Sequence, residues 1–146
     1  MATNSGASDG RYTPGIGHVG SYQVAGRPFI TGSAGGTTLA NGAEDTINFP
    51  NVTRSITVIN FGSNAIRVHF ASKDTGNTVA ANGGHFIELD SDEDSITMNV
   101  RADAIYISNA SGADNLEYKV YAELTGIATG STDLAYNATS LAGLTE

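Results

Sequence analysis

The stretch LEYKVYAEL, residues 116–124, decides the fold class of this chain. Apolar and polar side chains alternate along it, with Leu116, Tyr118, Val120, Ala122 and Leu124 set against Glu117, Lys119, Tyr121 and Glu123. A repeat of two residues places successive side chains on opposite faces of a strand. The pattern therefore predicts a strand with one face on an apolar core and the other in water.

The same alternation recurs from residue 44 onward. It is found in TINF (46–49), RSITVINF (54–61), AIRVHFA (65–71), HFIELD (85–90), SITMNVR (95–101) and AIYIS (104–108). Short turn-rich connectors separate these segments, such as Gly62-Ser63-Asn64 and residues 109–114. No window shows a helical repeat with caps. We predict an all-β fold, an antiparallel β-sandwich or jelly-roll-like single domain with extended N- and C-terminal arms.

This texture divides the chain into three parts. Residues 1–43 are expected to form a glycine-rich N-terminal arm, with short extended segments at 19–25 and 28–33. Residues 44–124 are expected to form the β-sandwich body. Residues 125–146, small and polar with isolated Leu and Tyr, are a C-terminal extension that serves as a second arm or as an added edge strand.

Composition limits the function classes. The net charge is −8, from 15 acidic and 7 scattered basic residues, which argues against a nucleic-acid partner. There is no cysteine, so disulfides and thiol chemistry are excluded. We see neither a secretory signal nor an apolar run long enough for a membrane, and expect no membrane partner and synthesis in a cytoplasm.

The stretch GIGHVG (15–20) spells the glycine pattern of a dinucleotide-binding turn. That turn needs a strand before it, a helix after it and an acidic residue about 20 positions on. Here a Pro-Gly turn precedes the glycines, Gly26 and Pro28 interrupt the segment after them, and the distant position is Ala40. We interpret the match as chance and expect no cofactor.

Other polar clusters give no positive sign of catalysis. Asp90, Asp92 and Asp94 have calcium-loop spacing, but Ser95 and Arg101 replace the glycine and glutamate that such a loop requires. A solvated turn is the favoured interpretation, with weak cation binding left open. The histidines His18, His69 and His85 have no short-spaced partner for a metal site. We therefore predict a non-enzymatic protein without catalytic or metal-ligating residues.

Two tyrosines, Tyr106 and Tyr121, are predicted on the polar faces of their strands. They either form a contact or sugar-stacking surface, or pack at a sandwich edge or beneath an arm.

The N-terminal arm must offset the entropic cost of its own ordering. Ordering one residue costs about 1–2 kcal/mol, and buried apolar surface returns about 25 cal/mol per Å², so each residue must bury about 40–80 Å². The many glycines bury little. The arm is therefore expected to gain order by lying on another subunit or, alternatively, by wrapping its own sandwich. Its candidate partner-binding residues are His18, Tyr22, Val24, Arg27, Phe29 and Ile30.

The segments GHVGSYQVAGRPFITGS, RSITVIN, IRVHFAS and SITMNV resemble virion structural proteins of tailed phages that infect marine and cyanobacterial hosts. Within that group the resemblance is to capsid decoration, or cement, proteins. It implies a location on the virion, outside the shell, with the major capsid protein and other copies of the chain, as in a trimer, for partners. Removal of residues 1–33 is expected to abolish particle binding and leave the sandwich folded.

Two alternatives stay open. One is a neck, collar, tail or fibre component that binds a receptor or glycan. The other is a carbohydrate-binding jelly-roll module, although the absence of tryptophan disfavours a sugar platform.

Overall fold

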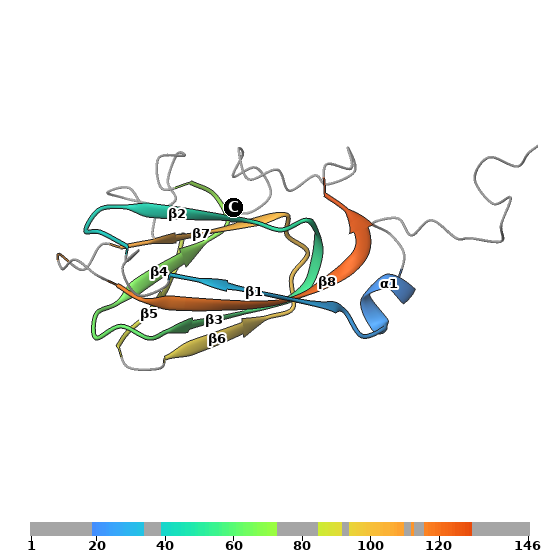
Figure 1. Cartoon of the computed structure of the whole chain (residues 1–146), viewed down its shortest axis with the longest axis horizontal. Coiled ribbons are helices and arrows are strands. Elements are labelled where there is room, and N and C mark those ends of the chain that lie inside the picture. The colour runs from blue at the N-terminus through green and yellow to red at the C-terminus, as the bar shows by residue number, and fades with distance from the viewer. Residues whose placement is uncertain are drawn as a thin grey trace, which may run out of the picture.

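The computed structural model describes residues 19–33, 39–72, 85–91, 94–109, 112 and 116–129. Within these residues the elements are α1 (Gly20–Gln23), β1 (Arg27–Gly32), β2 (Glu44–Asn48), β3 (Asn51–Asn60), β4 (Ile66–His69), β5 (Ile87–Leu89), β6 (Ser95–Met98), β7 (Ala104–Ser108) and β8 (Tyr118–Ala128). The strands form two four-stranded antiparallel sheets that face each other (Figure 1). The all-β sandwich predicted from the sequence is confirmed.

The first sheet has the strand order β1-β8-β3-β6 and the second has the order β2-β7-β4-β5. These orders arise from four nested antiparallel pairs, β1 with β8, β2 with β7, β3 with β6 and β4 with β5. The pairs of β3 with β8 and β4 with β7 complete the two sheets. A chain folded back as one long hairpin and rolled into two layers in this way has the connectivity of a jelly roll.

The core lies between the sheets and consists of the residues that the alternation placed inward. In β8, Tyr118, Val120, Ala122 and Leu124 are buried and Tyr121 is exposed. The other fully buried apolar side chains include Ile56, Val58, Ile66, Ile105, Ile107 and Leu116. Ile87, two residues before the buried Leu89 on the edge strand β5, is 39% exposed.

The extended conformation expected for residues 19–25 is wrong for residues 20–23, whereas Val24 is extended. Residues Gly20–Gln23 form one helical turn, α1, in which the N–H of Tyr22 bonds the carbonyl of Val19 at 3.0 Å. The physical reason is the Tyr22 ring, which packs on a small apolar cluster of Val52 and Ile127. This tertiary contact outweighs the weak local signal of the segment.

Parts of the sequence expected to lie outside the body belong to it. Strand β1, within the range assigned to the N-terminal arm, pairs with β8 along its whole length. Strand β8 continues past Leu124 to Ala128, where it curves beside α1 (Figure 1). For residues 27–32 the structure therefore favours the alternative in which the arm wraps its own sandwich.

Candidate docking surface at the N-terminal segment

Strand β1 lies at the edge of the first sheet, paired from Arg27 opposite Leu124 to Gly32 opposite Lys119. The Phe29 ring points into the sandwich and meets Phe49 edge to face, with centroids 5.3 Å apart. Because side chains alternate along a strand, Ile30 points the opposite way, and it is 73% exposed. The strand thus has one core-facing side and one solvent-facing side.

Two glycines allow β1 to lie this close to β8. A Cβ on Gly32 would fall 2.4 Å from the carbonyl oxygen of Tyr118, and one on Gly26 would fall 2.8 Å from the Cβ of Glu123. Neither approach is sterically open to another residue type without a shift of the backbone. The glycines that made this segment look like a loose arm therefore serve its docking.

The chain just before β1 is held by Arg54, which lies in a bulge of β3. Thr53 pairs with Leu124 and Ser55 with Glu123, so Arg54 is the extra residue between two consecutive pairs. A bulge of this kind turns a side chain in a new direction. Here it aims the guanidinium of Arg54 at the N-terminal segment.

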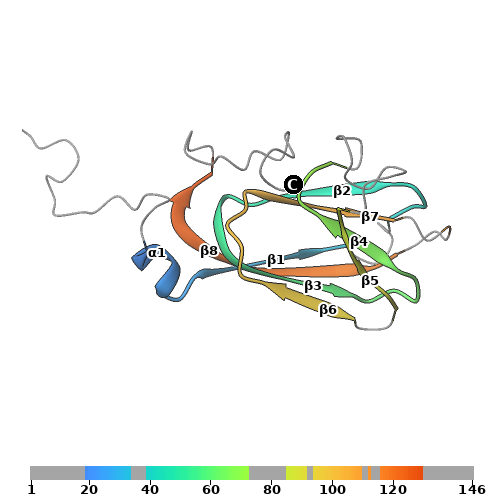
Figure 2. The same ribbon diagram turned by 180° about the vertical axis from the view of Figure 1, so that it is seen from behind.

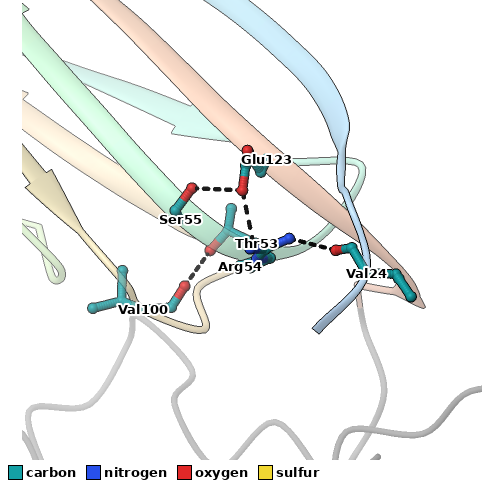
Figure 3. A network of polar contacts seen from close by, with 6 residues as sticks. All are labelled: Val24, Thr53, Arg54, Ser55, Val100 and Glu123. Carbon is teal, nitrogen blue, oxygen red and sulfur yellow. Dashed lines mark hydrogen bonds and ion pairs between the residues drawn. The ribbon is translucent and has the colours of Figure 1, made fainter. Parts of the chain in front are cut away.

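Figure 3 shows the contacts that result. The Arg54 guanidinium donates a hydrogen bond to the carbonyl oxygen of Val24, and its Nε lies 3.5 Å from Oε2 of Glu123. The same carboxylate oxygen accepts a hydrogen bond of 3.2 Å from the Ser55 hydroxyl. The Arg54 side chain, whose charge is balanced by Glu123, thereby fixes the backbone of Val24 to β3 and β8.

Three of the predicted partner-binding residues are already engaged within the chain. Tyr22 packs on its apolar cluster, with the Arg101 guanidinium 5.8 Å from its ring centroid. Arg27 donates a hydrogen bond of 2.7 Å to the side-chain oxygen of Asn51. Phe29 packs against the core.

Two of the predicted residues point into solvent. Val24 is 62% exposed and Ile30 is 73% exposed, and Val19, which is not among the six candidate residues, is 66% exposed. His18 lies outside the described residues. The six predicted residues therefore do not share one surface. The exposed apolar residues among them are Val24 and Ile30, and Arg27 is exposed but bonded to Asn51.

Ile30 has an exposed neighbour that sequence reasoning did not connect with it. It is the register partner of Tyr121 on β8, which is 39% exposed. The row continues across the sheet to Thr57 and Thr97, whose hydroxyl oxygens are 2.8 Å apart. Ile30 and Tyr121 are far apart in the sequence, so the local alternation of apolar and polar residues could not predict that they are neighbours.

Tyr106, the other tyrosine predicted on a polar face, is partly covered. Its ring stacks on that of His69 at a centroid distance of 5.9 Å and an angle of 11°. Burial, followed by the charges of Glu44 and Asp103, raises the pKa of Tyr106. The packing alternative is favoured for this residue, and the contact alternative for Tyr121.

A polar cluster around His69 on the second sheet leaves no trace in the sequence pattern. Nε2 of His69 lies 2.9 Å from the Ser108 hydroxyl, and Nδ1 lies 2.6 Å from the carbonyl oxygen of Ala71. A carbonyl only accepts, so Nδ1 carries a proton, and in the neutral ring Nε2 then accepts from the Ser108 hydroxyl. Glu44, which accepts a hydrogen bond from Ser72, lies 3.7 Å from Nε2.

A serine beside a histidine is also the pairing used by nucleophilic hydrolases. Here His69 and Ser108 are only 1% and 2% exposed, so the pair joins β4 to β7 inside the protein. Burial lowers the pKa of His69, against the smaller effects of the Ala71 carbonyl and Glu44. Burial thus favours the neutral imidazole, in which Nδ1 donates to Ala71 and Nε2 accepts from Ser108.

The Asp94 side chain of the acidic segment is hydrogen-bonded to backbone groups. The Asp94 carboxylate accepts hydrogen bonds from the N–H groups of Asp90, at 3.1 Å, and Ser95, at 2.9 Å. Asp92 lies outside the described residues. Across the part of the chain that the structure describes, no three histidine or acidic side chains gather as metal ligands would.

Comparisons with known proteins do not identify the chain. No protein-family model matches it, and no curated protein sequence is significantly similar to it. Its fold shows a weak likeness to the crystal structure of a Bacillus halodurans protein, with 12% sequence identity and a TM-score of 0.36. The likeness covers 66% of this chain and 62% of the other, less than two thirds of that protein's length. Among the described residues, no helix has the length and apolarity needed to span a membrane.

Proposed function

We propose that this chain is a non-enzymatic structural protein of a tailed-phage virion, a capsid decoration protein that binds the outside of the mature shell. Its partners are the major capsid protein and further copies of itself, and it needs no cofactor. The proposal rests on the resemblance of its segments to such proteins and on one structural observation. The observation is that the Val24 backbone is clamped by Arg54 and its side chain is left in solvent.

An apolar side chain held in water on a fixed backbone is suited to docking. Binding costs free energy for every side chain and loop that must be ordered, so a contact that is ordered in advance binds more tightly. Val24 meets this condition, and Val19 offers a second exposed apolar side chain across the helical turn. Both flank α1, which lies at one end of the sandwich (Figure 2). We assign the capsid contact to this end.

The mechanism of stabilisation is differential binding. A decoration protein that binds the expanded lattice more tightly than the immature one adds that difference in free energy to the mature state. The jelly-roll body supplies a rigid support, and the exposed valines supply the contact. No chemical step is involved.

The test is the number of copies per particle, measured by quantitative mass spectrometry on purified virions of the phage whose genome carries this gene. Hundreds of copies per virion, lost selectively from a Val24→Lys mutant phage, support the proposal. A handful of copies would instead assign the chain to the neck, collar, tail or fibre. Complete absence from virions would reject both assignments. The carbohydrate-binding alternative, with the solvent-facing Tyr121 as a glycan contact, would then be favoured.

A further inference from the structure

The backbone N–H and C=O groups of β1 point alternately toward β8 and away from it. Ser33, which comes after the pairing of Gly32 with Lys119, donates its N–H to the carbonyl of Tyr118 at 3.1 Å. In an antiparallel ladder the groups that face the partner strand recur at every second residue. The groups of residues 29, 31 and 33 therefore face β8, and those of 28, 30 and 32 point away from it.

Few backbone donors and acceptors of β1 point away from β8. Proline has no N–H, so the outward donors of β1 are the N–H groups of Ile30 and Gly32. The outward acceptors are the carbonyls of Pro28, Ile30 and Gly32. An edge of this kind is a template for pairing with another strand.

We propose that this edge pairs with β1 of a second copy of the chain. The two β1 strands run antiparallel and are related by a two-fold axis at Ile30. The β1-β8-β3-β6 sheets of the two copies then form one continuous sheet. Ile30 then exchanges hydrogen bonds with Ile30 of the partner subunit. The Gly32 N–H donates to the carbonyl of the partner subunit's Pro28. Every N–H on the outward edge finds an acceptor, and the missing N–H of Pro28 leaves no donor unpaired.

The side chains fit the same register. Ile30 lies beside Tyr121 on the outer face, so the two-fold pairing joins both residues to their counterparts in one continuous apolar row. Cross-strand pairs of aromatic and β-branched residues stabilise a sheet. Pro28 falls opposite Gly32, which has no side chain to crowd it. A shift of the register by two residues would set Ile30 against Gly32 and lose the contact between the two isoleucines.

The occupant is a second copy because the edge is self-complementary. Edge strands that avoid pairing often carry charged side chains, but the outward residues of β1 are proline, isoleucine and glycine. The nearby Arg27 is bonded to Asn51. A two-fold contact uses the same patch on both subunits, which is the symmetry of most homodimers. This surface is separate from Val24, so it does not depend on the capsid contact.

Sedimentation velocity on the purified full-length protein, with no capsid present, tests the proposal. We expect the wild type to sediment as a dimer and Ile30→Lys as a monomer with an unchanged circular dichroism spectrum. The matched control Val24→Lys adds the same charge at another exposed apolar position and should stay dimeric. A wild type that is a monomer or a trimer, or an Ile30→Lys protein that stays dimeric, overturns the proposal.

Single-cysteine variants provide a second test, because the chain has no cysteine of its own. The proposed register brings the two copies of residue 30 to a Cα separation of about 5.5 Å, within reach of a disulfide. Mild oxidation should convert Ile30→Cys to a covalent dimer and leave Val24→Cys as a monomer. Equal crosslinking of the two variants, or none at residue 30, contradicts the register. Failure of the decoration role would leave both solution results unchanged.

Discussion

The Tyr118 hydroxyl donates a hydrogen bond of 2.7 Å to the carboxylate of Asp45, which links β8 of the first sheet to β2 of the second. Burial, and then the bond to Asp45 and its charge, raise the pKa of Tyr118 far above its usual range. The hydroxyl therefore stays protonated at neutral pH and can donate to Asp45. It is a polar contact between the two layers that supplements the apolar core.

Tyr118→Phe should lower the free energy of unfolding by about 1.5–3 kcal/mol, the usual loss for a hydrogen bond to a charged group. The variant removes the donor and leaves the Asp45 carboxylate partly buried without it. Urea denaturation monitored by circular dichroism measures the change. Tyr121→Phe, on the solvent side of the same strand, should shift the midpoint little. Equal midpoints for wild type and Tyr118→Phe would show that the link contributes nothing.

Stability should fall as the pH drops below about 6.5. Burial holds the pKa of folded His69 below the value of 6.5 for a free histidine, so the unfolded chain binds this proton more readily than the native one. The contribution of His69 is complete above pH 6.5 and is lost as the pH falls through its lower, folded pKa. Denaturation midpoints at a series of pH values should show this loss.

Carboxylates also titrate in acid, so a variant must isolate the histidine. His69→Gln keeps a polar side chain but cannot take up a proton, and its stability should vary less between pH 7 and pH 5 than that of the wild type. Parallel curves for the two proteins would exclude His69 as the source.

Gly32→Ala should destabilise the docking of β1, because the new Cβ would meet the Tyr118 carbonyl at 2.4 Å. We expect a loss of about 1–3 kcal/mol, the range for overpacking. Gly20→Ala is the control, since a Cβ there has nothing within 4 Å. Hydrogen exchange should show faster exchange at the amides of Phe29 and Thr31 in Gly32→Ala alone. Unchanged protection of these amides would mean that β1 does not depend on the close approach.

Arg54→Met should release the segment before β1 without unfolding the body. The substitution keeps an unbranched side chain of four heavy atoms but removes the guanidinium, which is the donor to Val24 and the partner of Glu123. Limited proteolysis should then cleave residues 19–26 faster than in the wild type, with a similar melting temperature. Arg67→Met, which breaks an ion pair with Glu88 on the second sheet, is the matched control. Equal cleavage rates in both variants would contradict the clamp.

Much of the fold could be predicted because it rests on local alternation. Ile56 and Val58, or Ile105 and Ile107, indicate a buried face within a few residues, and each pair is fully buried. Which strands pair with each other could not be predicted from local alternation. Residues 27–32 contain Pro28 and Gly32, which lower the strand signal, and their partners are the distant residues 119–124. Nothing in the local sequence pattern shows that Gly26 and Gly32 allow β1 to lie close to β8.

The candidate site was harder to predict for the same reason. Phe29 and Ile30 are adjacent and both apolar, yet one packs on Phe49 and the other faces solvent beside Tyr121. Only the register with β8 separates them. Arg54 is directed at Val24 by a bulge, and His69 is covered although it alternates with apolar residues on a strand with one polar face. Each of these features depends on tertiary contacts.

The central claim, that the end of the sandwich bearing Val24 binds a phage shell, is tested most directly by cosedimentation with capsids. Undecorated mature capsids of the parent phage should be mixed with the wild type, with Val24→Lys, and with Thr46→Lys, which adds the same charge at an exposed position of β2. We predict saturable binding of the wild type and Thr46→Lys and at least a tenfold loss for Val24→Lys, a difference of about 1.4 kcal/mol or more. Wild-type protein that stays in the supernatant, or Val24→Lys that binds as tightly as Thr46→Lys, would contradict the account.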